Sequence, residues 1–190
     1  ICAVGGYGEV GRNMTAVKID DDVVVFDMGL HLPNYIKYTE EETGEVIKLS
    51  AAELKRVNAI PDDRVIHDWH SKVRAIIPSH AHLDHIGAIP YMADGYDAQI
   101  ICTPFAANVI NSILRDEKIK LHNKIVSLPP NQTFVISDNL KVEFVNVTHS
   151  IPETVMVALH TKHGVILYAT DFKLDDSPVV GPKPNYNRLK

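Results

Sequence analysis

Three histidines and an aspartate lie within six positions of this sequence, at His80, His82, Asp84 and His85, in the order H-x-H-x-D-H. Imidazole and carboxylate groups suit Zn²⁺, with Mn²⁺ and Fe as alternatives, and no thiolate is needed. Any one of these residues alone would most often be an ordinary surface or core residue. Four of them at this spacing, directly after the apolar run 73–77, predict a site for divalent metal ions.

Ligand-type side chains also follow three other apolar runs of the sequence. They are Asp27 after residues 23–26, His149 after residues 140–147, and Asp171 after residues 165–169. Taken singly, each would be an ordinary loop or strand-end residue. Because the pattern repeats, we expect the ends of four strands to share one edge of a layered sheet and to bring these residues together.

The pattern of apolar and β-branched residues predicts the elements that must position this site. Strands are predicted at about 1–4, 14–19, 23–27, 73–77, 99–102, 124–127, 133–136, 140–147, 154–161 and 164–169, and helices around 51–57, 86–93 and 104–119. Early hairpins followed by mixed strands and helices indicate the α+β class, with sheet layered between helices.

Residues 6–11 match G-x-G-x-x-G, the pattern of dinucleotide-binding loops, and Asp27 follows at about the spacing of a ribose-binding carboxylate. Such a site needs a helix immediately after the glycines. Residues 14–19 and 23–26 are instead rich in β-branched side chains and separated by three aspartates, which predicts a hairpin and leaves no room for a crossover helix. We therefore expect no dinucleotide cofactor.

The composition sets only broad limits on function. A chain of 190 residues with 45% apolar content can bury one core, as a single domain or a large part of one. The net charge of −5 argues mildly against a polyanionic partner. Cys2 and Cys102 form no C-x-x-C pair, so we expect no disulfide framework and a reducing cytoplasm. No apolar run approaches the length of a membrane span, and we expect no membrane association.

Several motifs resemble a known family. The H-x-H-x-D-H motif, together with His149 and Asp171, resembles the metallo-β-lactamase superfamily of binuclear metal hydrolases. The stretches GGYGEVGRN, FDMG, SHAHLDHIGAIPY, THSIPE and YATDFKLD resemble, more narrowly, the ribonuclease J family in the β-CASP group of that superfamily. The long insert before His80 is similar to that of the archaeal branch, and the resemblance covers essentially the whole chain.

The resemblance implies a metallo-β-lactamase αββα sandwich with two divalent ions, of which Zn²⁺ is the first expectation and Mn²⁺ the alternative. The implied ligands are His80, His82 and His149 for the first ion, Asp84 and His85 for the second, and Asp171 between the two. Asp27 is implied to lie beside these ligands, where it would orient a histidine or hold a proton. Thr170 departs from the commoner family spelling, which has glycine before the bridging aspartate, but this removes no ligand.

The resemblance also implies that the fold is incomplete in this chain. Residues 1–175 would form the N-terminal part of the metallo-β-lactamase domain, with 33–70 as a family-specific insert. Residues 176–190, rich in proline and polar side chains, would be a linker towards a missing RNA-binding β-CASP domain. One more histidine for the second ion is expected from a later segment.

The implied activity is that of a 5′-to-3′ exoribonuclease, with endonuclease action as an addition. Two ions about 3.5–4 Å apart lower the pKa of a shared water, and the resulting hydroxide attacks phosphorus in line. Asp84 and Asp171 are predicted to be catalytic. Gly6, Gly8 and Ser150 are predicted to contact substrate, although turn roles explain them equally well. We expect RNA as the partner and a cytoplasmic homodimer of the full-length protein.

Two other functions remain open from the sequence. One is another hydrolase of the same superfamily, either an endonuclease of the cleavage-and-polyadenylation type or a thioester hydrolase. A β-CASP insertion after residue 190 would favour phosphodiester cleavage over a thioester substrate. The other is an inactive scaffold subunit, against which the intact metal-type residues argue, because a scaffold requires none of them.

Overall fold

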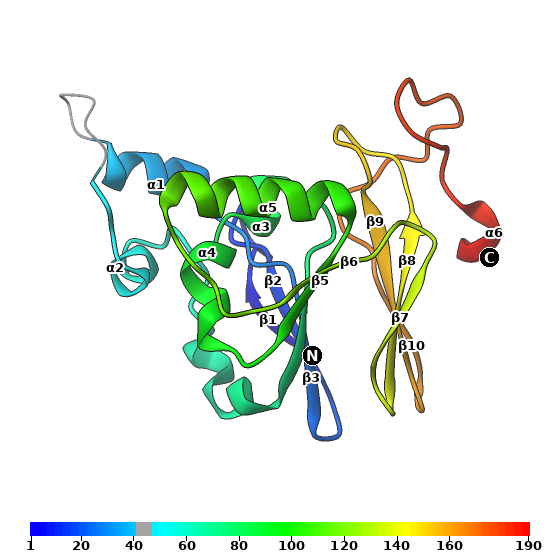
Figure 1. The fold of residues 1–190 in the computed structure, drawn as a ribbon, viewed down its shortest axis with the longest axis horizontal. Helices are drawn as coiled ribbons and strands as arrows, with labels where there is room; N and C mark the ends of the chain where they lie inside the picture. Colours follow the sequence, from blue (N-terminus) through cyan, green and yellow to red (C-terminus); the bar gives the residue numbers. More distant parts are fainter. Residues whose placement is uncertain (41–46) are drawn as a thin grey trace.

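The computed structural model describes residues 1–40 and 47–190, and two β-sheets packed face to face form its centre (Figure 1). Helices α1, α2 and α4 lie on the side of the first sheet that faces away from the second sheet (Figure 1). The short helix α6 lies on the far side of the second sheet (Figure 1). The order of layers is therefore helices, sheet, sheet, helix.

The first sheet has six strands in the order β1-β2-β3-β4-β5-β6. They are β1 Cys2–Gly5, β2 Met14–Ile19, β3 Asp22–Phe26, β4 Val73–Ile77, β5 Gln99–Cys102 and β6 Ile125–Ser127. Strand β2 pairs antiparallel with both β1 and β3, whereas β3 through β6 are parallel. The predicted hairpin after the glycine loop is confirmed, because β2 and β3 pair from Thr15 opposite Phe26 to Ile19 opposite Asp22.

The second sheet has four antiparallel strands in the order β10-β9-β8-β7. They are β7 Thr133–Ser137, β8 Leu140–Asn146, β9 Val155–Thr161 and β10 Gly164–Tyr168. Since β8 and β10 both run antiparallel to β9, they run in the same direction as each other. Each of the ten predicted strands corresponds to an observed one.

The central strands of the first sheet are buried on both faces. Val23 and Val25 of β3 pack into the core beneath the helices, whereas Val24 and Phe26 pack against the second sheet. Phe144 of β8 is among the side chains that meet them from that sheet. Burial on both faces explains why β3 is a continuous apolar run rather than an alternating one.

The helices agree less closely with prediction than the strands do. The structure contains α1 Leu32–Thr39, α2 Ala51–Arg56, α3 Leu83–Ile86, α4 Ile89–Met92, α5 Pro104–Glu117 and α6 Tyr186–Leu189, with 3₁₀ helices η1 Asp63–Lys72 and η2 Ala93–Gly95. The helices predicted around 51–57 and 104–119 are confirmed. The single helix predicted around 86–93 is wrong. The N–H of Ala88 donates to Met28 O instead, and Pro90 has no N–H to donate, so the turns separate into α3 and α4.

The fold does not test the roles predicted for two segments, the insert 33–70 and the linker 176–190. Residues 33–70 contain most of α1, all of α2 and the first part of η1, and their residues 41–46 lie outside the described part of the chain. Residues 176–190 pack against β8, where Asn185 N donates to Asn146 O at 2.9 Å. Within the described residues, no helix is long and apolar enough to cross a membrane.

Candidate metal centre

The ligand-type residues meet at one edge of the two sheets. In the first sheet, β3 and β4 end side by side, and the loops that follow them carry Asp27 and the histidine cluster. In the second sheet, β8 and β10 end at the same edge and are followed by His149 and Asp171. Since β3 and β4 run in the same direction, as do β8 and β10, the four strands end at one place.

One set of candidate ligands consists of His80, His82 and His149, whose ligand atoms all lie within 4.8 Å of one another. His80 Nε2 is 2.9 Å from His82 Nδ1. The ring of His149 stands edge-on to both, with centroid distances of 5.1 Å to His80 and 5.0 Å to His82. Ser150 Oγ lies 3.5 Å from His82 Nε2, so the residue predicted to contact substrate borders this set.

A second set consists of His80, His85 and Asp171, again within 4.8 Å. Asp171 Oδ2 is 3.7 Å from His85 Nε2 and 3.9 Å from His149 Nε2, so this carboxylate faces both sets. Asp84 lies beside the second set, with its Oδ2 3.4 Å from His85 Nε2. The predicted residues are therefore gathered together, with His80 common to both sets.

The surroundings give neighbouring histidines opposite charge preferences. Burial, followed by the nearby His85, lowers the pKa of His80 to about 3. Burial also acts against a charged His85, but the Asp27 carboxylate and its hydrogen bond raise the pKa of His85 to about 10. Burial raises the pKa of Asp84, yet the hydrogen bond and charge of His85 outweigh it and leave that pKa below its ordinary value.

Asp27 is fully buried and anchors the cluster through several hydrogen bonds. Its Oδ1 accepts a bond from Ser79 N at 2.7 Å, and its Oδ2 accepts bonds from His85 Nδ1 and Tyr168 OH, both at 2.8 Å. Ser79 Oγ adds a fourth bond at 3.1 Å. With Nδ1 held in this way, His85 presents Nε2 to Asp84 and Asp171. Sequence reasoning placed Asp27 beside the ligands but missed Ser79 and Tyr168.

Asn13 and Gly29 are two further residues that sequence reasoning did not assign. Asn13 Nδ2 donates to Asp84 O at 3.0 Å and lies 3.3 Å from His85 Nε2. A Cβ on Gly29 would lie 1.6 Å from Asp84 O, so only glycine fits there. Both residues stand in motifs that carried the family resemblance, GGYGEVGRN and FDMG, and this is the signal that was available.

The glycine loop reaches the cluster only in part. Gly6 lines a pocket of about 240 Å³ that also contains His85, Tyr168 and Asp171. At Gly6, with φ of 91°, a Cβ would lie 2.3 Å from Asn13 Oδ1, whereas a Cβ on Gly8 would meet none of the described residues within 4 Å. Gly6 is thus required by close packing around Asn13, and substrate contact by Gly6, Gly8 and Ser150 remains a prediction.

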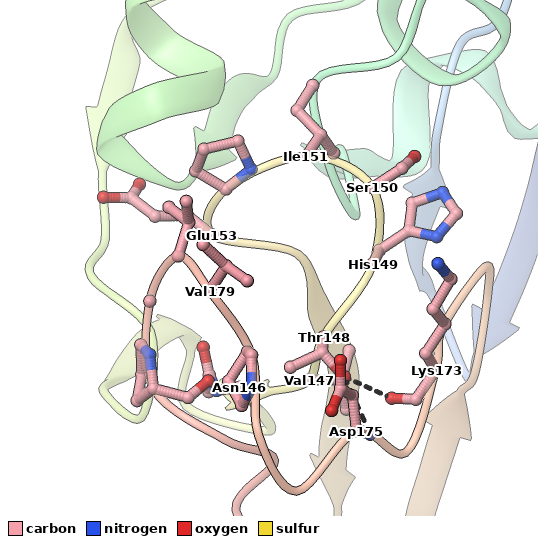
Figure 2. Close-up of a pocket in the computed structure, with 15 residues that line it drawn as sticks. Asn146, Val147, Thr148, His149, Ser150, Ile151, Glu153, Lys173, Asp175 and Val179 are labelled. Atoms are coloured by element: carbon pink, nitrogen blue, oxygen red, sulfur yellow. Dashed lines mark hydrogen bonds between the residues drawn. The ribbon is translucent and has the colours of Figure 1, made fainter.

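A second pocket, of about 260 Å³, adjoins His149 between residues 146–153 and 173–182 (Figure 2). Lys173 stands at its edge, and Figure 2 shows its side chain extending towards His149. The backbone of Lys173 is fixed by two bonds to Thr148, both at 2.6 Å. Among the described residues, the Lys173 ammonium takes part in no ion pair, so its charge is available beside the cluster.

The donor set fits divalent metal ions. Burial lowers the pKa of His80 and keeps its imidazole neutral, as a metal ligand requires, and the buried Nδ1 of His149 has no hydrogen-bond partner among the described residues. The carboxylate behind His85 is the kind of partner that commonly fixes a metal-binding imidazole. Nitrogen and carboxylate donors without thiolate suit Zn²⁺, Mn²⁺ or Fe.

Comparison with known proteins agrees with this geometry. The model of a family described as "Beta-lactamase superfamily domain" matches residues 56–182. The chain belongs to this superfamily.

Two solved structures share its fold: a protein of unknown function from Enterococcus faecalis and a metallo-β-lactamase from Cronobacter sakazakii. The first is 19% identical, with a TM-score of 0.62, covering 87% of this chain and 41% of that one. The second is 14% identical, with a TM-score of 0.56, covering 88% and 56%. The predicted metallo-β-lactamase fold is thereby confirmed.

Within the superfamily, the chain is homologous to ribonuclease J. It is 41% identical to the ribonuclease J of Methanocaldococcus jannaschii over 191 residues, covering 100% of the chain and 42% of that protein. It is equally similar to the ribonuclease J of Pyrococcus abyssi, with 41% identity over 192 residues and the same coverage. The predicted resemblance to the archaeal branch is confirmed, and the chain spans 42% of the length of these relatives.

Proposed function

We propose that the protein is a metal-dependent ribonuclease that hydrolyses RNA phosphodiester bonds, acting as a 5′-to-3′ exonuclease with additional endonuclease action. The observation that carries the proposal is the pair of ligand sets sharing His80, with the Asp171 carboxylate facing both. Homology to proteins named ribonuclease J supports RNA as the substrate. Zn²⁺ is the metal we expect first.

Divalent ions held by these residues would supply a nucleophilic water at neutral pH and offset negative charge on phosphate oxygens. The protein's own part is to hold and orient. Asp84, whose pKa lies below its ordinary value, is ionised at neutral pH and lies beside His85, where it would help to orient the water. Asp27 keeps His85 aimed, and His82 and His149 complete the other set.

Positive charge for the RNA backbone comes from few side chains near the cluster. The net charge of the chain is −5, so long-range attraction of a polyanion is weak. Lys173 supplies one cation beside His149, and bound metal ions would add charge that the formal count leaves out. This supports recognition of a phosphate at the cluster itself rather than along a broad basic surface of this chain.

The organisation of the longer protein forms part of the same proposal. Residues 1–175 would be the N-terminal part of the catalytic domain, with 33–70 as an insert, and 176–190 would lead to a β-CASP domain that contributes the main RNA groove. The relatives' greater length supports this division, because the chain spans 42% of each archaeal ribonuclease J. A cytoplasmic homodimer is the assembly we expect.

The decisive experiment combines metal analysis of the full-length protein with degradation of RNA that carries a 5′ monophosphate or triphosphate. We expect two bound ions per chain and turnover that falls at least about a hundredfold in His80→Ala. His122→Ala is the matched control, since His122 is exposed and bonds only to Asp94 among the described residues. Absence of metal and turnover, with His80→Ala unchanged from wild type, would refute the proposal.

Circular RNA separates the two modes of cleavage. A circle has no 5′ end, so a pure exonuclease leaves it intact, whereas an endonuclease linearises it. We expect rapid loss of linear 5′-monophosphorylated RNA and slower cutting of the circle. A circle that is cut as fast as the linear RNA would overturn the exonuclease part of the proposal and leave the hydrolytic chemistry standing.

A further inference from the structure

We propose that Tyr168 is a positioning residue for the second ligand set. Its hydroxyl fixes the Asp27 carboxylate that aims His85, and so keeps His85 in register with Asp171. The inference deepens the proposed function and rests on it, since it concerns how the same centre holds its second ion.

The geometry around Asp27 carries the inference. Tyr168 OH donates to Asp27 Oδ2 at 2.8 Å, the same oxygen that accepts from His85 Nδ1 at 2.8 Å. The Tyr168 hydroxyl and the His85 imidazole therefore make the two shortest bonds to this oxygen, and Ser79 Oγ adds a longer one at 3.1 Å. Ser79 N donates to the other oxygen, Oδ1, at 2.7 Å. Without the Tyr168 hydroxyl, one restraint on the oxygen that contacts His85 is lost.

The hydrogen bond also joins two separate sheets at the metal edge. Asp27 follows β3 of the first sheet, whereas Tyr168 is the last residue of β10 in the second sheet. Asp171 lies three residues beyond Tyr168 on the same chain segment. The Tyr168–Asp27 bond thus sets the spacing between the segment that carries Asp171 and the Asp27 carboxylate that orients His85.

The hydroxyl and the ring of Tyr168 have separable roles. The ring stacks on Phe26 with centroids 4.8 Å apart and planes 8° from parallel, so it contributes to the core between the sheets. Burial, followed by the charge of Asp27, raises the pKa of Tyr168, which keeps the hydroxyl protonated as a donor. Removing the hydroxyl while keeping the ring therefore tests the positioning role and leaves the packing in place.

The experiment compares Tyr168→Phe with wild type in a titration of the metal-free, full-length protein with Co²⁺, followed by visible absorbance. Tyr91→Phe is the matched control, because its hydroxyl bonds to Tyr35 OH at 3.1 Å, away from the cluster. We expect Tyr168→Phe to weaken the binding of one of the two Co²⁺ ions about tenfold and to change the absorption band of that ion. The other ion, and both ions in Tyr91→Phe, should bind as in wild type.

Three results would overturn the inference: unchanged affinity for both ions in Tyr168→Phe, equal weakening of both ions, or a wild-type protein that binds a single ion. The titration contains no RNA, so its outcome is separate from that of the ribonuclease assay. A selective loss of one ion in a protein that cleaves no RNA would uphold the positioning role and refute the ribonuclease. Cleavage of RNA by wild type, together with unchanged metal binding in Tyr168→Phe, would uphold the ribonuclease and refute the positioning role.

Discussion

His80 and His85 have ring centroids only 4.1 Å apart, yet their pKa values are shifted in opposite directions. Within residues 1–40 and 47–190 no carboxylate is hydrogen-bonded to His80, so burial dominates and lowers its pKa to about 3. His85 bonds directly to the buried Asp27, which raises its pKa to about 10. At the scale of single residues, hydrogen-bond partners matter more than residue type, and the partners come from distant parts of the sequence.

Those distances explain which site residues could be predicted. The candidate ligands are recognisable because histidine and aspartate are ligand types, and their positions after apolar strands are visible in the sequence. The supporting residues carry no such mark. Ser79 and Tyr168 bond to Asp27 across 52 and 141 positions, and Asn13 bonds to Asp84 across 71 positions. Serine, tyrosine and asparagine have many ordinary roles, so only the folded chain reveals these pairings.

Gly29 carries the first prediction at this scale. In Gly29→Ala the new Cβ would lie 1.6 Å from Asp84 O, so the loop after β3 or the start of α3 must move. We expect the free energy of unfolding to fall by about 3 kcal/mol, at the upper end of overpacking effects. Urea unfolding followed by circular dichroism measures it.

Gly8→Ala is the control for this prediction, because in the part of the chain that the structure describes no atom lies within 4 Å of a Cβ at Gly8. Its free energy of unfolding should change by no more than about 0.5 kcal/mol. Equal stability of the two variants would show that the contact between Gly29 and Asp84 is not tight in the folded protein.

At the scale of elements, strands were easier to predict than helices, for physical reasons. Runs such as Val23–Val24–Val25 favour a pleated, buried strand whatever their neighbours. Helix α1 was missed because the residue that caps its start is His31, whose ring accepts a bond from Asn34 N, and histidine is not among the usual capping residues. The break between α3 and α4 depends on Met28 O taking the N–H of Ala88, a tertiary contact that local pattern does not encode.

Helix α6 carries the second prediction. Arg188 Nε and Nη2 donate to Glu143 Oε1 and Oε2, both at 2.7 Å, and His160 Nε2 lies 2.8 Å from Oε2. The bond from Arg188 outweighs the effect of burial and holds the pKa of Glu143 below its ordinary value. Since Arg188 is half-exposed, we expect Glu143→Gln to lower the free energy of unfolding at pH 7 by about 1–2 kcal/mol.

The pH dependence of this effect has a defined sign. A carboxylate whose pKa is lower in the folded state contributes its full stabilisation above the unfolded pKa and loses it as pH falls through the folded pKa. The difference between wild type and Glu143→Gln should therefore shrink on acidification below about pH 4.5. Asp138→Asn, in the turn between β7 and β8, is the control. A difference that stays constant down to pH 3 would mean that the ion pair does not form in solution.

At the scale of the whole molecule, the candidate centre is built from both sheets. His80, His82 and His85 come from the end of the first sheet, whereas His149 and Asp171 come from the end of the second. Strand prediction alone suggested that four ends share an edge, but it did not determine which strands pair or that β3–β6 are parallel. Pairing between β3 and β4 joins segments separated by the 33–70 insert, and it depends on burial of both faces rather than on local sequence.

Because the ligands come from two sheets, metal ions should stabilise the fold by linking them. An ion that binds only the native state stabilises it by about 2.7 kcal/mol when its free concentration is about a hundred times its dissociation constant. For a chain of this size, such a gain raises the midpoint of thermal unfolding by roughly 5–10 °C.

We expect Zn²⁺ to produce this increase in wild type and chelation to reverse it. In His80→Ala the increase should be lost almost entirely, because His80 belongs to both sets. Ca²⁺, which prefers oxygen ligands, should give little change. An equal rise in wild type and His80→Ala would mean that the stabilising ion binds elsewhere and that the two sheets are not joined through this centre.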